Sequence, residues 1–408
     1  MQMRNNGKSQ QELRAPSGRL LALTIVFMLG LAYVLRIVNI SGESLWRDEV
    51  DSIRFSFASL DELLRNLSRH GFNGPLYELL VRVWLTLAGV NDFALRYLSL
   101  IFGVLQVALI YNFARRLFGS LAALIAALTA TLAPVLIWYS GEGKMYSLQP
   151  TLLLLALYAM HRAISLPVSH TLPNGGMRDL GRRMNGWWIV FVAAVSLAFY
   201  VHLLSPLFLA VALVFLLLWW RRTRLHWIGA VISFALCTIP YVPMAAWQLP
   251  TFIQGFATGH EFLQLDLMLS SLLINWSVGL SASRMQGVSD VFVISAVVCL
   301  VVIACLGLWA TVSAWTPKGV WDIKHADSTT LFRSAIGVFV WLLLPVLLVF
   351  VISLRAPVFQ PRYLLWSAPA LYILIGIGIS WLMERARIAA IVCLALVVLI
   401  SLYGTLAQ

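Results

Sequence analysis

The sequence predicts an all-α protein that crosses a membrane many times. Of its 408 residues, 61% are hydrophobic and only 11% are charged, and the mean hydropathy is +0.86. A soluble chain of this length could not bury so much apolar surface. The apolar stretches are continuous, whereas the strands of a membrane β-barrel alternate polar and apolar residues. We therefore expect one polytopic helical domain over residues 1–408, without a separate soluble domain.

About eleven apolar runs come near the ~20 residues that a helix needs to cross a bilayer. They lie at 20–38, 93–113, 120–139, 146–165, 187–201, 203–220, 226–246, 290–314, 333–354, 363–383 and 388–405. All four cysteines fall inside these runs and show neither disulfide nor metal-binding spacing. The first run is too long, and lacks the small-residue cleavage site, for a removed signal peptide. We therefore expect it to be kept as the first span.

The basic residues indicate the orientation of these spans. With a cytoplasmic N-terminus, the cytoplasmic segments carry 18 of the 29 Lys and Arg residues but only 5 of the 17 Asp and Glu residues. This distribution agrees with the positive-inside rule. It also accounts for the formal net charge of +12 without a nucleic-acid partner. We expect a multi-pass plasma-membrane protein of the bacterial inner-membrane type, surrounded by membrane lipids.

The first outer loop, at about 39–92, is long and acidic, and two stretches within it predict amphipathic helices. Ser59-Leu60-Asp61-Glu62 has the form of a capping box, and leucines follow it at helical spacing up to a stop at Gly71. A second helix begins near Pro75 and ends at Gly89. We expect both helices to lie in the outer membrane interface or to pack on the core, and to form a wall beside Asp48.

Polar side chains that could do chemistry gather at the outer ends of the spans. Asp48 and Glu49 follow the first span directly, and carboxylates at a membrane face are costly to desolvate. Either could act as a general base, while Lys144 and Arg362 could stabilise a phosphate leaving group. The full set of outer polar residues is Asp48, Glu49, His70, Asn73, Glu142, Lys144, Tyr146, His202, Arg355 and Arg362.

The turn 355–363 is the most basic outer turn, so it departs locally from the charge rule. An arginine pair such as Arg355 and Arg362 at headgroup depth is suited to a phosphate, although simple interfacial anchoring is the alternative. The chain has no Walker loop, dinucleotide fingerprint or HExxH motif. This inventory favours transfer from a lipid-linked phosphate to an acceptor hydroxyl outside the cytoplasm, because such a donor needs no nucleotide fold.

Four blocks in this order resemble the GT-C glycosyltransferases, in particular the protein-mannosyltransferase-like group and the lipid A aminoarabinose transferases. The first block is Asp48-Glu49. The second is Gly74-Pro75-Leu76-Tyr77-Glu78-Leu79-Leu80, with Phe93-Ala94-Leu95-Arg96 behind it. The third is Tyr139-Ser140-Gly141-Glu142-Gly143-Lys144-Met145-Tyr146, and the fourth is Arg362-Tyr363-Leu364-Leu365 followed by Pro369.

The resemblance implies a GT-C fold and a polyprenyl-phosphate-linked sugar as donor. Asp48 would be the catalytic base, assisted by Glu49 and Glu142, and the transition state would be oxocarbenium-like. The donor phosphate would be bound by Arg362, by Lys144, which lies where the family usually has an arginine, and by Arg355 and Tyr146. The substrate pocket would comprise His70, Asn73, His202 and Tyr363. The acceptor could be a lipid, a glycan or a protein, and the sequence does not identify the sugar.

Several alternatives stay open at this point. The oligosaccharyltransferase-type DxD motif is absent, so no metal site is expected; a divalent metal held by His70, His202, Asp48 and Glu142 is the alternative. The chain could also be a ligase or polymerase of lipid-linked glycans, or a structural scaffold. A flippase or transporter of polyprenyl lipids should carry ionisable residues near mid-bilayer, whereas here the polar residues gather on one face. A one-sided enzyme is therefore favoured.

Overall fold

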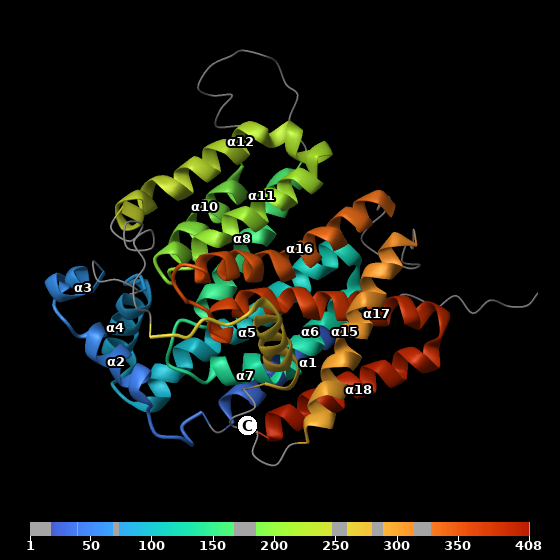
Figure 1. Ribbon diagram of the computed structural model, residues 1–408, viewed down its shortest axis with the longest axis horizontal. Helices are drawn as coiled ribbons and strands as arrows, with labels where there is room; N and C mark the ends of the chain where they lie inside the picture. The colour runs from blue at the N-terminus through green and yellow to red at the C-terminus, as the bar shows by residue number, and fades with distance from the viewer. Residues whose placement is uncertain are drawn as a thin grey trace, which may run out of the picture.

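The computed structural model describes residues 18–38, 40–67, 73–166, 185–246, 259–279, 289–313 and 328–407. All regular secondary structure in these ranges is helical, as the sequence predicts (Figure 1). The first half contains α1 (Gly18–Ile37), α2 (Arg47–Ser56), α3 (Leu60–Leu67), α4 (Leu76–Ala88), α5 (Asp92–Phe118), α6 (Ser120–Leu132), α7 (Pro134–Ser140), α8 (Leu148–Ser165) and α10 (Gly186–Phe199). The second half contains η1 (Ser205–Leu207), α11 (Phe208–Leu218), α12 (Trp220–Thr238), η2 (Ile239–Tyr241), α14 (Leu265–Val278), α15 (Asp290–Val312), α16 (Ser328–Ser353), η3 (Pro361–Ser367), α17 (Ala368–Arg385) and α18 (Arg387–Leu406).

Each of the eleven apolar runs is helical, but fewer than eleven qualify as spans by length and composition. Among the described residues, seven helices are long and apolar enough to cross a membrane, and the bent pair α6–α7 would make an eighth. The helices α10 and α11 are too short to be counted, and α8 carries His161 and Arg162 near its end. By these criteria the described residues give fewer spans than the about eleven that the sequence predicts, whereas the predicted all-α membrane fold is confirmed.

Helix α17 forms the centre of the bundle. In the span Pro361–Arg385, which comprises η3 and α17, 94% of the most apolar 18-residue stretch is buried, against 17% in the span of α1 and 28% in that of α18. Glycines let the neighbouring backbones approach closely: a Cβ on Gly376 would lie 2.4 Å from the carbonyl oxygen of Ala122 on α6, and one on Gly378 would lie 2.2 Å from that of Ile303 on α15. Such small-residue contacts are how membrane helices pack without a hydrophobic driving force between them.

The run predicted as one span at 120–139 is broken. α6 ends at Leu132, and α7 begins at Pro134 after a bend of 58°. Proline cannot donate its backbone nitrogen, so the preceding turn has free carbonyl groups. Arg36 of α1, only 2% exposed, donates to the carbonyl oxygens of Ala130 and Thr131 and to Ser140 Oγ. This buried arginine, for which no role was predicted, therefore fixes α7 and the turn that follows it.

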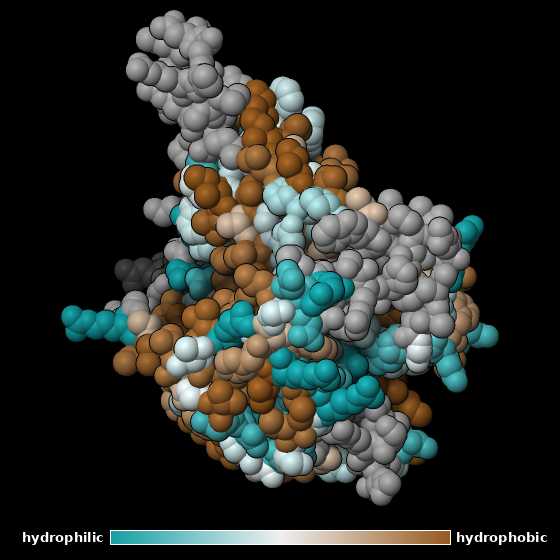
Figure 2. Space-filling view, turned by 90° about the vertical axis from the view of Figure 1, so that its left-hand side faces the viewer, coloured by the Kyte–Doolittle hydropathy of each residue, from teal (hydrophilic) through white to brown (hydrophobic). Residues whose placement is uncertain are grey.

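Helices α2, α3 and α4, in the loop that the sequence predicts to be outside, lie together on one side of the bundle (Figure 1). One of the two hydrogen bonds of the predicted capping box is present, since the backbone N–H of Glu62 donates to Ser59 Oγ at 3.2 Å. Helix α4 ends as predicted before Gly89, whose φ is +87°. One face of α4 buries Tyr77, Val81 and Leu85, whereas its other face exposes apolar residues such as Leu87. Figure 2 shows hydrophilic and hydrophobic residues intermingled on this side of the molecule. The placement of these helices in a membrane interface stays a prediction.

Candidate active site

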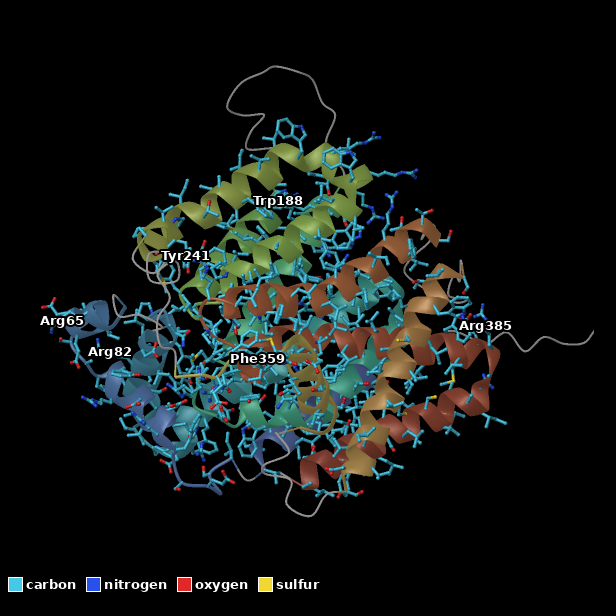
Figure 3. The ribbon with its side chains drawn as sticks, in the orientation of Figure 1. Arg65, Arg82, Trp188, Tyr241, Phe359 and Arg385 are labelled. Atoms are coloured by element: carbon cyan, nitrogen blue, oxygen red, sulfur yellow. The ribbon has the colours of Figure 1, made fainter. Side chains whose placement is uncertain are left out.

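The site lies where the segment 360–363 meets the first turn of α2. Asp48 is in that first turn, and its Oδ2 forms an ion pair with Arg362 Nη1 at 3.6 Å. Their side chains are 33% and 24% exposed, so both can reach a ligand. Figure 3 shows Phe359, just before this segment, at the end of the bundle that faces α2 and α4, and Arg385, at the far end of α17, on the opposite side. The structure thus brings together two residues that the sequence predicts for one site.

Three aromatic rings surround the Arg362 guanidinium. Its Cζ lies 5.7 Å from the ring centroid of Trp46, 5.4 Å from that of Tyr146 and 5.7 Å from that of Tyr363. Rings at this distance attract a cation through their negative faces. Arg362 Nε is buried and has no hydrogen-bond partner in the part of the chain that the structure describes. The guanidinium is therefore held in position with donor capacity left unused.

Glu49, although adjacent to Asp48, has different neighbours. It is fully buried, and its carboxylate accepts from Arg96 Nε at 2.8 Å and Nη2 at 2.7 Å. It also accepts from the backbone N–H groups of Gly143 at 2.8 Å and Trp46 at 3.3 Å. Adjacent residues on a helix point about 100° apart, which separates the two carboxylates. Glu49 thus connects α2, α5 and the turn after α7, which carries Glu142 and Lys144.

Glu142 and Lys144 lie in that turn. Glu142 Oε1 accepts from Trp138 Nε1 at 2.6 Å, while Oε2 is buried and has no hydrogen-bond partner among the described residues. Burial raises the pKa of Glu142 to about 7, more than the Trp138 hydrogen bond and the Arg362 charge lower it. Burial also lowers the pKa of Lys144. The charge of Glu78, and then those of Asp48 and Asp51, raise this pKa and so partly oppose the effect of burial. This turn therefore adds a readily protonated acid and a cation to the site.

His202, Asn73 and Tyr363 form one side of the site. The His202 ring packs on the Tyr363 ring, with 5.0 Å between centroids, and His202 is only 2% exposed. Asn73 Oδ1 accepts from the backbone N–H of Leu203 at 3.1 Å. The next residue, Gly74, passes so close to Tyr200 that a Cβ there would lie 2.1 Å from the Tyr200 carbonyl oxygen. The Gly74-Pro75 block thus docks α4 against the turn that carries His202.

Two predicted site residues are not joined to this group. Arg355 is exposed, and its side chain makes no hydrogen bond or ion pair with the residues that the structure describes. His70 lies outside the described residues. The described part of the chain contains no group of three or more His, Cys, Asp or Glu residues that could hold a metal ion.

Several residues that shape the site had no role predicted from the sequence. Arg96 belongs to a block that carries the resemblance, yet its pairing with Glu49 spans 47 residues of sequence. Trp46 and Trp138 contact Arg362 and Glu142 directly. For the two tryptophans, the sequence offered one indication, which is that each lies within four residues of a predicted site carboxylate.

Comparison with known proteins supports this description of the fold. Residues 72–247 match the family model described as Dolichyl-phosphate-mannose-protein mannosyltransferase. This segment includes α4, the Glu142–Lys144 turn and His202. A search of curated protein sequences found no match.

Two solved structures share the fold at low sequence identity. ArnT from Cupriavidus metallidurans bound to undecaprenyl phosphate superposes with a TM-score of 0.57 and 16% identity, over 92% of this chain and 63% of the ArnT chain. The Archaeoglobus fulgidus oligosaccharyltransferase in complex with Zn and sulfate also gives 0.57 and 16%, over 94% of this chain and 53% of its own. The chain thus spans between about half and two thirds of the length of these proteins.

The chain therefore shares its fold with ArnT and with an oligosaccharyltransferase. Residues 72–247, less than half of the chain, also match the mannosyltransferase family model. Both findings agree with the resemblance to protein-mannosyltransferase-like and ArnT-like GT-C proteins that the four sequence blocks indicated.

Proposed function

We propose that the chain transfers a sugar from a polyprenyl-phosphate-linked donor to an acceptor hydroxyl on the extracytoplasmic side of the membrane. One observation carries the proposal: a carboxylate, Asp48, and a guanidinium, Arg362, lie 3.6 Å apart among three aromatic rings at one end of an apolar bundle. The fold shared with an ArnT structure bound to undecaprenyl phosphate supports a lipid phosphate as the ligand.

Arg362 is the main binding group for the donor phosphate. Its unused Nε–H and its Nη groups can donate to phosphate oxygens in the planar geometry that guanidinium groups provide. Lys144 adds a second positive charge, and the Tyr146 ring holds Arg362 in place. Arg355, exposed on the same outer turn, can meet the phosphate as the lipid enters.

Asp48 is the general base. It removes the proton from the acceptor hydroxyl, whose oxygen attacks the anomeric carbon of the sugar. The bond between that carbon and the phosphate oxygen breaks, and its electron pair leaves with the polyprenyl phosphate. The phosphate therefore changes from a diester with one negative charge to a monoester with two, next to Arg362, where the extra charge is stabilised.

The Arg362 guanidinium that would bind the donor phosphate is also the one that forms the ion pair with Asp48. A donor phosphate competes for the same guanidinium, so binding of the donor releases the Asp48 carboxylate for the acceptor. At 3.6 Å, with both side chains partly exposed, this pair is weak enough to be replaced.

The other predicted residues support these two. Glu49 acts as a positioning residue, because its hydrogen bonds are to Arg96, Gly143 and Trp46. Glu142 offers a free carboxyl oxygen for the acceptor hydroxyl. His202, Asn73 and Tyr363 form the wall of the substrate pocket.

The test is transfer from a panel of radiolabelled polyprenyl-phosphate sugars by protein in proteoliposomes, with cell-envelope membranes as acceptors. Wild type should give labelled product, and Asp48→Asn should lower the rate by at least about 100-fold, as expected for loss of a general base. Asp61→Asn, which changes an exposed acid on α3, is the matched control and should act like wild type.

The alternatives predict other results in the same assay. A transporter would move the labelled lipid between leaflets without product that depends on Asp48. A ligase or polymerase would transfer only preassembled glycans. Either result would overturn the proposed reaction.

A further inference from the structure

The tautomer of His202 follows from its hydrogen bonding. The backbone N–H of Leu204 donates to His202 Nδ1 at 3.1 Å, so Nδ1 is the acceptor and the ring proton is on Nε2. Packing on Tyr363 fixes the plane of the ring. Burial lowers the pKa of His202 to about 3, and the charge of Arg362 adds to this effect. His202 is therefore a neutral N–H donor with a fixed direction.

This donor has no acceptor in the part of the chain that the structure describes. His202 Nε2 is buried and has no hydrogen-bond partner among the described residues, as is also the case for Arg362 Nε. A buried polar group without a partner costs about 1–3 kcal/mol, so such groups are normally satisfied by a ligand or by water. Both side chains contact the Tyr363 ring: the centroid of the His202 ring lies 5.0 Å from that of Tyr363, and Arg362 Cζ lies 5.7 Å from it. One of the two unsatisfied N–H donors is neutral and the other is cationic. A ligand rich in anionic oxygens would satisfy both.

We propose that His202 Nε2–H donates a hydrogen bond to the donor phosphate and stabilises it as the leaving group. This inference rests on the proposed function and assigns His202 an atomic role in it. The phosphate gains one negative charge when the bond to the sugar breaks, so the hydrogen bond strengthens in the transition state. A neutral donor provides this stabilisation without binding the lipid phosphate product as tightly as a third cation would.

The test compares two substitutions of similar volume. His202→Gln keeps an N–H donor near the position of Nε2, whereas His202→Met has none. We expect His202→Met to lower kcat about 100-fold, as when one donor of an oxyanion site is removed, with a change in donor KM of less than about threefold. We expect His202→Gln to stay within about tenfold of wild type. The Kd for undecaprenyl phosphate should rise about tenfold in the Met variant only.

His161 provides the matched control. It is also a buried histidine, and its Nδ1 also lacks a partner among the described residues. It lies 13 residues beyond Leu148, the first residue of α8, and therefore about 20 Å along that helix from the site turn. His161→Met should bind undecaprenyl phosphate as wild type does. If His202→Met fails to fold by its thermal transition, His202→Asn, whose amide ends short of Nε2, replaces it.

The outcomes separate this inference from the proposed function. If wild type neither binds undecaprenyl phosphate nor transfers sugar, the proposed function is wrong. If wild type binds it and Arg362→Gln loses binding, but His202→Met keeps the wild-type kcat and Kd, only the role of His202 is wrong. Equal losses of kcat and of undecaprenyl phosphate binding in the folded Gln and Met variants would also overturn that role, because the histidine would then contribute packing and not a hydrogen bond.

Discussion

Replacing Arg96 with Met tests whether the buried pair with Glu49 organises the site. Arg96 donates twice to the Glu49 carboxylate and also to the carbonyl oxygens of Ile40, Glu43 and Ser44. The substitution leaves a carboxylate that is 0% exposed without its cation. Removing one partner of such a pair typically costs about 3–5 kcal/mol, most of it from the charge left behind.

The assay is the free energy of unfolding of purified protein in detergent, followed by denaturant titration. Arg96→Met should lose about 3–5 kcal/mol. Arg82→Met is the matched control: Arg82, on α4, donates to a single carbonyl, that of Ala58, so its loss should cost about 1 kcal/mol. The double variant Glu49→Leu/Arg96→Met removes both charges and should recover part of the loss.

Equal stability of the Arg96→Met and Arg82→Met variants would refute this reasoning. So would a double variant less stable than Arg96→Met, because the cost would then come from lost packing rather than from an unpaired charge.

Three further predictions concern other parts of the site. Arg362→Gln should weaken undecaprenyl phosphate binding at least about tenfold, since a charge-assisted contact is worth about 1.5–3 kcal/mol, while Arg385→Gln at the opposite end should not. Because burial raises the pKa of Glu142 from 4.5 to about 7, the wild type should lose stability as the pH rises from about 4.5 through 7. Glu142→Gln should abolish that slope in thermal melts across this range, and an unchanged slope would contradict the assignment. Gly74→Ala should destabilise the protein by about 1–3 kcal/mol, since its Cβ would meet the Tyr200 carbonyl oxygen; a wild-type melting temperature would show that the contact relaxes freely.

Local signals in the sequence predicted most of the helices. Apolar runs of sufficient length gave the helices of the bundle, and the capping box at Ser59 and the stop at Gly89 gave the ends of shorter ones. Helix α2 was not predicted, because its first turn is polar and Trp46 is not a usual N-cap residue. The bend before Pro134 was hidden inside an unbroken apolar run, and its partner, Arg36, lies almost 100 residues earlier.

The sequence predicted the main pair of site residues, but not the contacts that hold them. The predicted topology put Asp48 and Arg362 on the same face of the membrane, and in the structure they form an ion pair. The partner of Glu49 could not be predicted, because it depends on how α2 rotates against α5 and thus on packing between distant segments. The contacts of Arg362 with aromatic rings were likewise beyond sequence reasoning, since three separate segments supply those rings.

The most direct test of the central claim is a structure of the protein with undecaprenyl phosphate bound in lipid nanodiscs. We expect the phosphate to lie within hydrogen-bond distance of Arg362 and the 3.6 Å contact between Asp48 and Arg362 to be lost, so that the carboxylate faces the open side of the pocket. A phosphate bound elsewhere, with the ion pair of Asp48 and Arg362 intact, would contradict it.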